Sequence, residues 1–159
     1  MAMCAEWLPR AVAHGDDVEV RGRMMMASMF AGLAFSNASL GLVHAMAHSL
    51  GGRMDAVHGE CNALLLEHVV RFNYAQAQDR YDRVFERLRP LMKDSSMDLS
   101  GLIHEFRVRL GMDETLSDIG VKASDIPQLA QNASKDPCLA TNPRMASMRE
   151  IEDVYERAL

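Results

Sequence analysis

Residues 41–52 read GLVHAMAHSLGG and contain two of the six histidines of the chain, His44 and His48, with no proline between them. In an α-helix, residues four positions apart lie on one face, one turn from each other. The segment is also rich in Ala, Leu and Met, which favour helices over strands. We therefore expect a helix over residues 42–50 that ends at Gly51-Gly52 and carries both imidazoles on the same face.

Helical patterns continue on both sides of this segment. Before it, we expect a short helix at residues 6–13 and a longer one that starts at Val18, is capped by Asp16 or Asp17 and reads as buried. After it, glycines and prolines separate further stretches with apolar periodicity. These predict a polar loop at residues 93–97 and helices at residues 62–73, 75–91, 99–110, 124–133 and 148–158. No stretch has convincing strand periodicity, so the sequence predicts an all-α multi-helix bundle, one domain over residues 1–159.

Composition excludes several classes of protein. The chain has 159 residues, 48% of them hydrophobic, which is enough for one domain with a real core. Its formal net charge of −5 argues against nucleic-acid partners, which need a basic surface. No uninterrupted apolar run reaches the roughly 20 residues of a membrane span. Glu6, Pro9 and Arg10 interrupt any signal peptide at the start. We therefore expect neither a nucleic-acid nor a membrane partner.

The three cysteines point to a reducing compartment. Cys4, Cys61 and Cys138 are odd in number, far apart and without Cys-x-x-Cys spacing. That pattern fits reduced thiols in a cytoplasmic protein better than a disulfide framework or a cysteine-rich zinc site.

A third histidine, His58, follows the glycine pair and can return toward the face of His44 and His48 from a second element. Histidine is the commonest metal ligand and titrates near neutrality. From these residues alone, the trio could be hydrogen-bonded core side chains, a complete three-histidine metal site or half of a site completed elsewhere. A His-Glu-x-x-His protease is excluded because Ala45 occupies the glutamate position. An independent hydrolase lacks a well-placed acid, since Asp55 and Glu60 are the only close ones.

The wider pattern resembles the iron-containing (group III) alcohol dehydrogenases. The His-x-x-x-His spacing followed by His-Gly is its specific part, and the resemblance runs in order along nearly the whole chain. It is carried by AGLAFSN (31–37), GLVHAMAH (41–48), HGECNA (58–63), LLEHV (65–69), RFN (71–73), Thr115-Leu116, Gly120-Val121, IPQLA (126–130) and NPR (142–144). The chain departs from the family at Ser49 and Val57, where proline is usual, and at Glu67.

In that family, the resembling part is the helical, dehydroquinate synthase-like C-terminal domain. The resemblance implies that His44 and His58 are metal ligands for Fe²⁺ or Zn²⁺. It implies that His48 is not a ligand but a catalytic residue that contacts the cofactor and relays a proton. Phe35 and Cys138 match positions that line the substrate pocket in some relatives. Asn142 and Arg144 are expected to brace the last helix.

The resemblance also implies partners. An NAD(P) cofactor, a small alcohol or aldehyde, and an N-terminal dinucleotide-binding domain complete the family's site, and nothing in this chain resembles that domain. We therefore expect the isolated chain to be inactive and prone to self-association, including as a homo-oligomer. The alternative is a non-catalytic helical assembly or interaction module derived from the same family.

Overall fold

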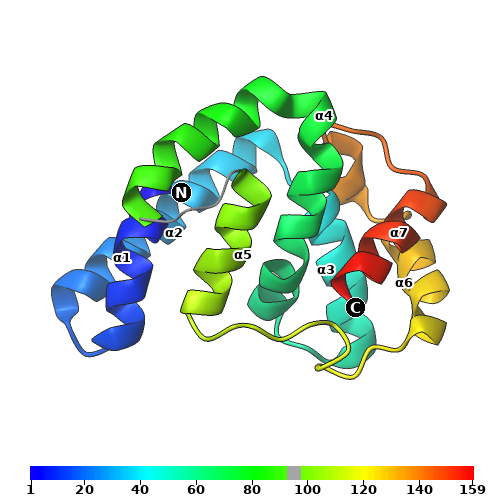
Figure 1. Cartoon of the computed structure of the whole chain (residues 1–159), viewed down its shortest axis with the longest axis horizontal. Helices are drawn as coiled ribbons and strands as arrows, with labels where there is room; N and C mark the ends of the chain where they lie inside the picture. The colour runs from blue at the N-terminus through cyan, green and yellow to red at the C-terminus, as the bar shows by residue number, and fades with distance from the viewer. Residues whose placement is uncertain (93–97) are drawn as a thin grey trace. The chain divides into compact units, whose positions relative to one another are not determined.

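The computed structural model describes residues 1–92 and 98–159, and these contain helices and no strand, which confirms the predicted all-α fold (Figure 1). The loop expected at residues 93–97 lies outside the described residues. The helices are α1 (Ala2–Ala13), α2 (Val18–Ala38), α3 (Leu42–Met54), α4 (His58–Met92), α5 (Leu99–Arg109), α6 (Ile126–Ala133) and α7 (Met148–Ala158), with short 3₁₀ turns η1 (Ala123–Asp125) and η2 (Pro137–Thr141).

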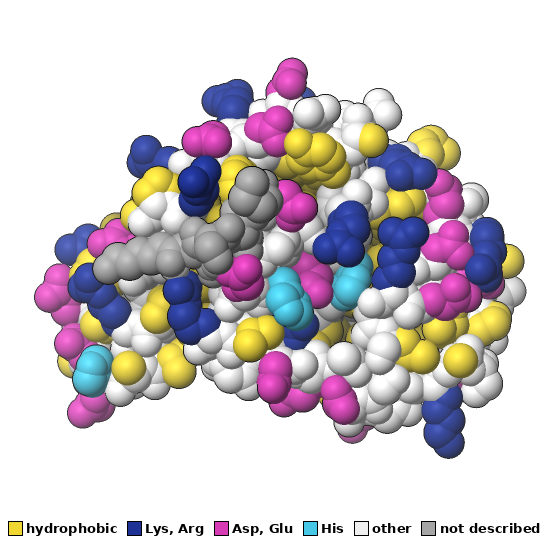
Figure 2. Space-filling view, viewed as in Figure 1, with side chains coloured by type: hydrophobic (Ala, Val, Ile, Leu, Met, Phe, Trp, Pro, Cys, Tyr) yellow, Lys and Arg dark blue, Asp and Glu magenta, His cyan; other side chains and the backbone are white. Residues whose placement is uncertain are grey.

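The chain forms two compact units, and α4 contributes to both. Unit 1 comprises residues 1–39 and 79–112, and unit 2 comprises residues 40–78 and 113–159. In α4 the backbone leaves the helical region at Ala77, with φ −134° and ψ 29°, next to the point where the units divide. On the face drawn in Figure 2, acidic and basic side chains are interspersed over both units, in keeping with the small net charge.

The histidine-bearing helix is longer than its sequence suggested. We expected it to end at Gly51-Gly52, but α3 continues through both glycines to Met54. Glycine lowers helix stability without forbidding the helix. The helix stops instead at Asp55, which adopts the left-handed conformation with φ 53°, a region that aspartate tolerates better than most residues. Then α4 begins at His58, four residues before the expected start, and joins the two helices expected at residues 62–73 and 75–91.

Helix α2 begins as expected but is not buried. Asp17 caps it by accepting hydrogen bonds from the amides of Glu19 and Val20. Its large apolar side chains are nevertheless exposed, with Met25 at 74% and Phe35 at 49%. The apolar residues of α2 occur on all of its sides instead of forming one stripe. Composition alone therefore could not show which side of the helix other residues cover. Among the described residues no single helix is long and apolar enough to cross a membrane. Helices α2 and α3 taken together have the length and composition for a span, but the helix breaks between them.

Unit 2 contains a core built around α3. This helix packs against α6, and α6 packs against α7. Tyr155 is fully buried and donates its hydroxyl hydrogen to the carbonyl of Met46 at 2.8 Å. Ser49, one of the departures from the family pattern, donates to the carbonyl of Leu129 at 2.9 Å. Fully buried side chains in this core include Leu42, Met46, Leu50, Cys61, Leu65, Leu116, Leu129 and Ile151.

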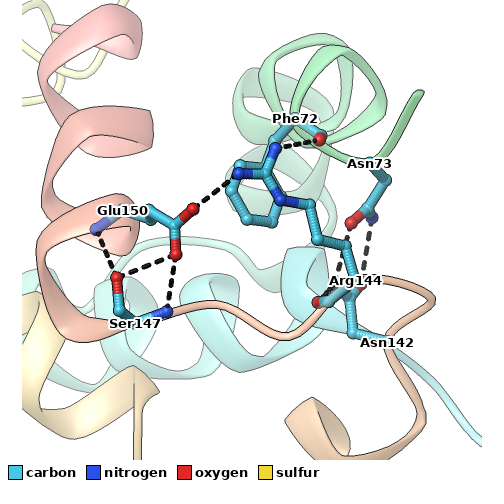
Figure 3. Close-up of polar contacts among 6 residues, drawn as sticks. All are labelled: Phe72, Asn73, Asn142, Arg144, Ser147 and Glu150. Carbon is cyan, nitrogen blue, oxygen red and sulfur yellow. Dashed lines mark hydrogen bonds and ion pairs between the residues drawn. The ribbon is translucent and has the colours of Figure 1, made fainter. Parts of the chain in front are cut away.

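The amide of Asn142 holds the start of α3 and pairs with the amide of Asn73 (Figure 3). Its Oδ1 accepts hydrogen bonds from the backbone amide of Leu42 and from Nδ2 of Asn73, both at 3.0 Å. Its Nδ2 donates to Oδ1 of Asn73 at 2.8 Å. A Cβ at Gly41 would stand 3.0 Å from Asn142 Oδ1, so a larger residue there would force the Asn142 amide to shift by a few tenths of an ångström. An amide side chain thus replaces the helical partner that the first amide of α3 lacks.

Arg144 links this segment to the start of α7, as the sequence led us to expect. It donates to the carbonyl of Phe72 at 2.9 Å and to Glu150 at 2.5 Å, and its guanidinium lies 4.0 Å from the centre of the Phe72 ring (Figure 3). Glu150 also completes a capping box with Ser147, the N-cap of α7. Arg144 therefore braces the last helix, whereas the hydrogen bonds of Asn142 go to α3, to Asn73 on α4 and to the carbonyl of Arg144.

Replacing Asn142 with alanine should lower the free energy of unfolding by about 1–3 kcal/mol, because the Leu42 amide and the nearly buried Asn73 lose their partners. Chemical denaturation followed by circular dichroism measures the change. The control is Asn132→Ala, which removes an exposed amide from α6. Equal losses for the two variants would contradict the role of Asn142.

Candidate functional site

The three histidines singled out from the sequence lie together in unit 2. His44 and His48 are one turn apart on α3, and His58 is the first residue of α4, after the reversal at Asp55. The ring centres of His44 and His58 are 5.5 Å apart, those of His48 and His58 are 5.3 Å apart, and those of His44 and His48 are 6.0 Å apart. The helical spacing and the turn before α4 therefore bring three imidazoles to one place.

The surroundings of His44 favour its neutral form. Burial lowers the pKa of His44 below its usual value, and the neighbouring imidazoles of His58 and His48 lower it further. A neutral imidazole keeps a lone pair available for a cation. Three imidazole rings form a donor set suited to divalent transition metals, including iron and zinc. The residues present therefore fit the metal that the resemblance implies.

Asn62 is a neighbour of this cluster that the sequence did not single out. Its Nδ2 donates to Nε2 of His58 at 3.0 Å and to the carbonyl of His58 at 3.0 Å. Its Oδ1 is buried and has no hydrogen-bond partner among the described residues. Because an amide nitrogen can only donate, Nε2 of His58 is the acceptor and its lone pair is directed to Asn62. Rotation of Asn62 would release this lone pair for a cation. The four-residue spacing from His58 on α4 was the available signal.

Asp136 is a second residue that sequence reasoning missed. Its Oδ2 lies 2.9 Å from Nδ1 of His48, and its Oδ1 accepts from the backbone amide of Cys138 at 2.8 Å as the cap of η2. Burial alone would raise the pKa of Asp136, but hydrogen bonds from Cys138 and His48 outweigh it and hold the pKa below its usual value. The ionised carboxylate of Asp136 therefore accepts a hydrogen bond from Nδ1–H of His48. The only sequence signal was Asp before Pro, which is typical of a turn or cap.

Cys138 lies beside this pair, while Phe35 belongs to the other unit. Burial first, and then a hydrogen bond to Asp136, raises the pKa of the Cys138 thiol. The thiol sulfur, a carboxylate oxygen of Asp136 and a ring nitrogen of His48 all lie within 4.8 Å of one another. Phe35 is on α2 in unit 1 and half-exposed, so its pocket role stays a prediction.

An open pocket of about 570 Å³ adjoins the site in unit 2. His48, whose side chain is 42% exposed, is one of the residues that line it. Its lining is mostly polar and consists of Ala45, His48, Ser49, Gly52, Arg53, Asn132 and Asp136. Arg53 is paired there with Asp125 at 2.5 Å, which balances its charge.

Comparisons with known proteins identify a family and several relatives that this chain is similar to. The model of the C-terminal part of the Fe-containing alcohol dehydrogenase family matches residues 1–159. The chain is 35% identical to the NAD-dependent methanol dehydrogenase of Bacillus methanolicus, a match that covers 100% of this chain and 43% of that protein. It is 38% identical to the probable alcohol dehydrogenase EutG of Escherichia coli, with 99% of this chain and 40% of that protein covered.

A solved structure gives the same result. The alcohol dehydrogenase from Oenococcus oeni matches with a TM-score of 0.89 and 35% identity, over 99% of this chain and 43% of that chain. The chain thus spans about two fifths of the length of the relatives that it matches.

Proposed function

Because the chain belongs to the Fe-containing alcohol dehydrogenase family, matching its C-terminal model over residues 1–159, we propose that it is the metal and substrate domain of an NAD(P)-linked alcohol dehydrogenase. The whole protein would interconvert a small alcohol and its aldehyde by hydride transfer. The observation that carries this proposal is the convergence of His44, His48 and His58 within 5.3–6.0 Å between ring centres.

In this proposal, His44 and His58 hold the divalent cation, Fe²⁺ or Zn²⁺. When bound, the cation supplies Lewis-acid stabilisation of the alcohol oxygen, and the nicotinamide takes up the hydride. The chain contributes two imidazoles on separate helices, and burial and its neighbours lower the pKa of His44 and so favour its neutral form. Asn62 holds the ring of His58 in place until a cation takes the Nε2 lone pair.

His48 is proposed to move the hydroxyl proton. Asp136 accepts a hydrogen bond from Nδ1–H of His48. The opposite nitrogen, Nε2, therefore carries the lone pair that can accept a proton. The side chain is 42% exposed, which gives the proton a route to solvent. In this scheme His48 is the catalytic residue, and Asp136 is a positioning residue that fixes its tautomer.

A second domain is part of the proposal. The relatives that the chain matches are more than twice its length, and we propose that a dinucleotide-binding domain supplies the cofactor site and the remaining metal ligands. The 159-residue chain then serves as one helical domain and has no dehydrogenase turnover by itself. The exposed apolar side chains of α2 support the expected self-association of the isolated chain.

The proposal is tested by joining the chain to the dinucleotide-binding domain of a family relative. Purified protein is loaded with Fe²⁺ or Zn²⁺, and oxidation of NADH or NADPH is followed with a series of small aldehydes. We expect turnover by the joined protein and none by the chain alone. A joined protein that binds the cofactor but neither metal nor aldehyde would favour the non-catalytic module instead.

Asp136→Asn should lower kcat of the joined enzyme on the order of 10–100-fold, the usual cost of removing a carboxylate that orients a functional histidine. A neutral amide no longer selects the Nδ1–H form of His48. Nitrogen-15 NMR of the isolated chain measures that tautomer directly, and we expect it to shift in the variant. Asp125→Asn, which alters the exposed pair with Arg53, is the matched control. An unchanged His48 tautomer would refute the positioning role of Asp136.

A further inference from the structure

His48, Asp136 and Cys138 bring three different metal-binding donors together outside the pair formed by His44 and His58. Their ligand atoms lie within 4.8 Å of one another. Zinc bonds of about 2.0–2.3 Å place two donors at most about 4.4 Å apart, so small side-chain rotations are enough to surround one ion. We propose that these residues form a second site, for a zinc-class divalent cation, that shares no ligand with the cation proposed at His44 and His58.

The donor chemistry selects the class of ion. Thiolate and imidazole prefer zinc and copper, whereas magnesium, calcium and manganese prefer oxygen ligands. A carboxylate and a thiolate together carry two negative charges, which balance one divalent cation. Three protein ligands leave a fourth position for water, and the adjoining open pocket gives water and ions access to the exposed side of His48.

The local backbone already orders two of the three donors. Asp136 caps η2, and its Oδ1 accepts from the amide of Cys138, so both side chains leave the same tight turn. His48 reaches them from the second turn of α3, which packs against η2. The ligands are thus held by short polar contacts before any ion arrives, which reduces the ordering needed on binding.

Binding at this site changes protonation in a defined way. The Cys138 thiol releases its proton to solvent as its sulfur becomes a ligand. Nδ1 of His48 releases its proton to solvent and offers its lone pair to the cation, while Nε2 takes up a proton from solvent, so the ring stays neutral. If His48 relays a proton as proposed, Nε2 can then no longer accept one, so the second ion would inhibit the enzyme. Only this consequence rests on the proposed function.

Cobalt(II) titration of the reduced 159-residue chain tests the site, because a thiolate bound to cobalt produces a charge-transfer absorption that imidazole and carboxylate do not. We expect the absorption to saturate at one ion per chain and to disappear when Zn²⁺ is added. His44→Ala/His58→Ala should retain it, since neither residue supplies sulfur. Cys138→Ser should abolish it, and Asp136→Asn should weaken cobalt binding by at least about tenfold.

Cys4→Ser is the matched control, because Cys4 lies in unit 1 and should not affect the absorption. Circular dichroism verifies that each variant folds. If His44→Ala/His58→Ala does not fold, the presence or absence of the cobalt–thiolate absorption in the wild-type chain still decides the question. Absence of the absorption in wild type, or its persistence in Cys138→Ser, would overturn the second site. Neither result bears on alcohol turnover, so failure here is separate from failure of the proposed function.

Discussion

Replacing His44 or His58 with alanine in the joined enzyme is expected to reduce both bound metal and turnover by at least about 100-fold. Loss of a residue that merely orients a metal ligand already costs 10–100-fold, so loss of a ligand costs more. Each variant removes one of two imidazoles that we propose as ligands, and their ring centres are 5.5 Å apart. Metal content by elemental analysis and kcat/KM with NADH and an aldehyde measure the two effects.

The control for this experiment is His14→Ala, which removes an exposed histidine from unit 1. It should retain metal and activity at the wild-type level. Wild-type metal content and turnover in both His44→Ala and His58→Ala would end the proposal that these residues are ligands. Loss of turnover with full retention of metal would instead indicate that these residues act in proton transfer and not in cation binding.

Leu65→Ala should produce the largest loss of stability, about 2–5 kcal/mol of unfolding free energy. Leu65 is fully buried on α4 in the core of unit 2, and its truncation leaves a cavity as well as lost apolar contact. The next residue gives a matched control, because Leu66 is 36% exposed on the same helix. Leu66→Ala should cost less than about 1 kcal/mol. Urea denaturation followed by circular dichroism compares the two, and similar losses would contradict the assigned core.

Local signals in the sequence predicted much of the fold. Asp17 capped α2 as expected, because these contacts join residues only two or three positions apart. The glycine pair at 51–52 was misleading. Glycine signals that a helix can stop, but the left-handed conformation of Asp55 determines where it does stop. The exposure of α2 was also missed, because burial depends on what covers a helix and not on its own composition.

In the candidate site, too, local patterns predicted some residues and missed others. The spacing of His44 and His48 predicted a shared face, and the turn before His58 allowed the third ring to return to it. Asp136 could not be found in this way, because 88 positions separate it from His48 and no local pattern connects them. Cys138 entered only through the resemblance, and its contact with Asp136 depends on the turn that follows.

The polar contacts of Asn142 have a consequence for the order of events during synthesis. Helix α3 leaves the ribosome before the acceptor for its first amide, which is about 100 residues downstream, and before Tyr155, which anchors its middle. Domains generally acquire their structure as the chain is produced, from the N-terminus onward. The nascent histidine helix therefore waits for residues 142–155 before its start and centre are fixed, and the ring geometry needed for a cation is established only after them.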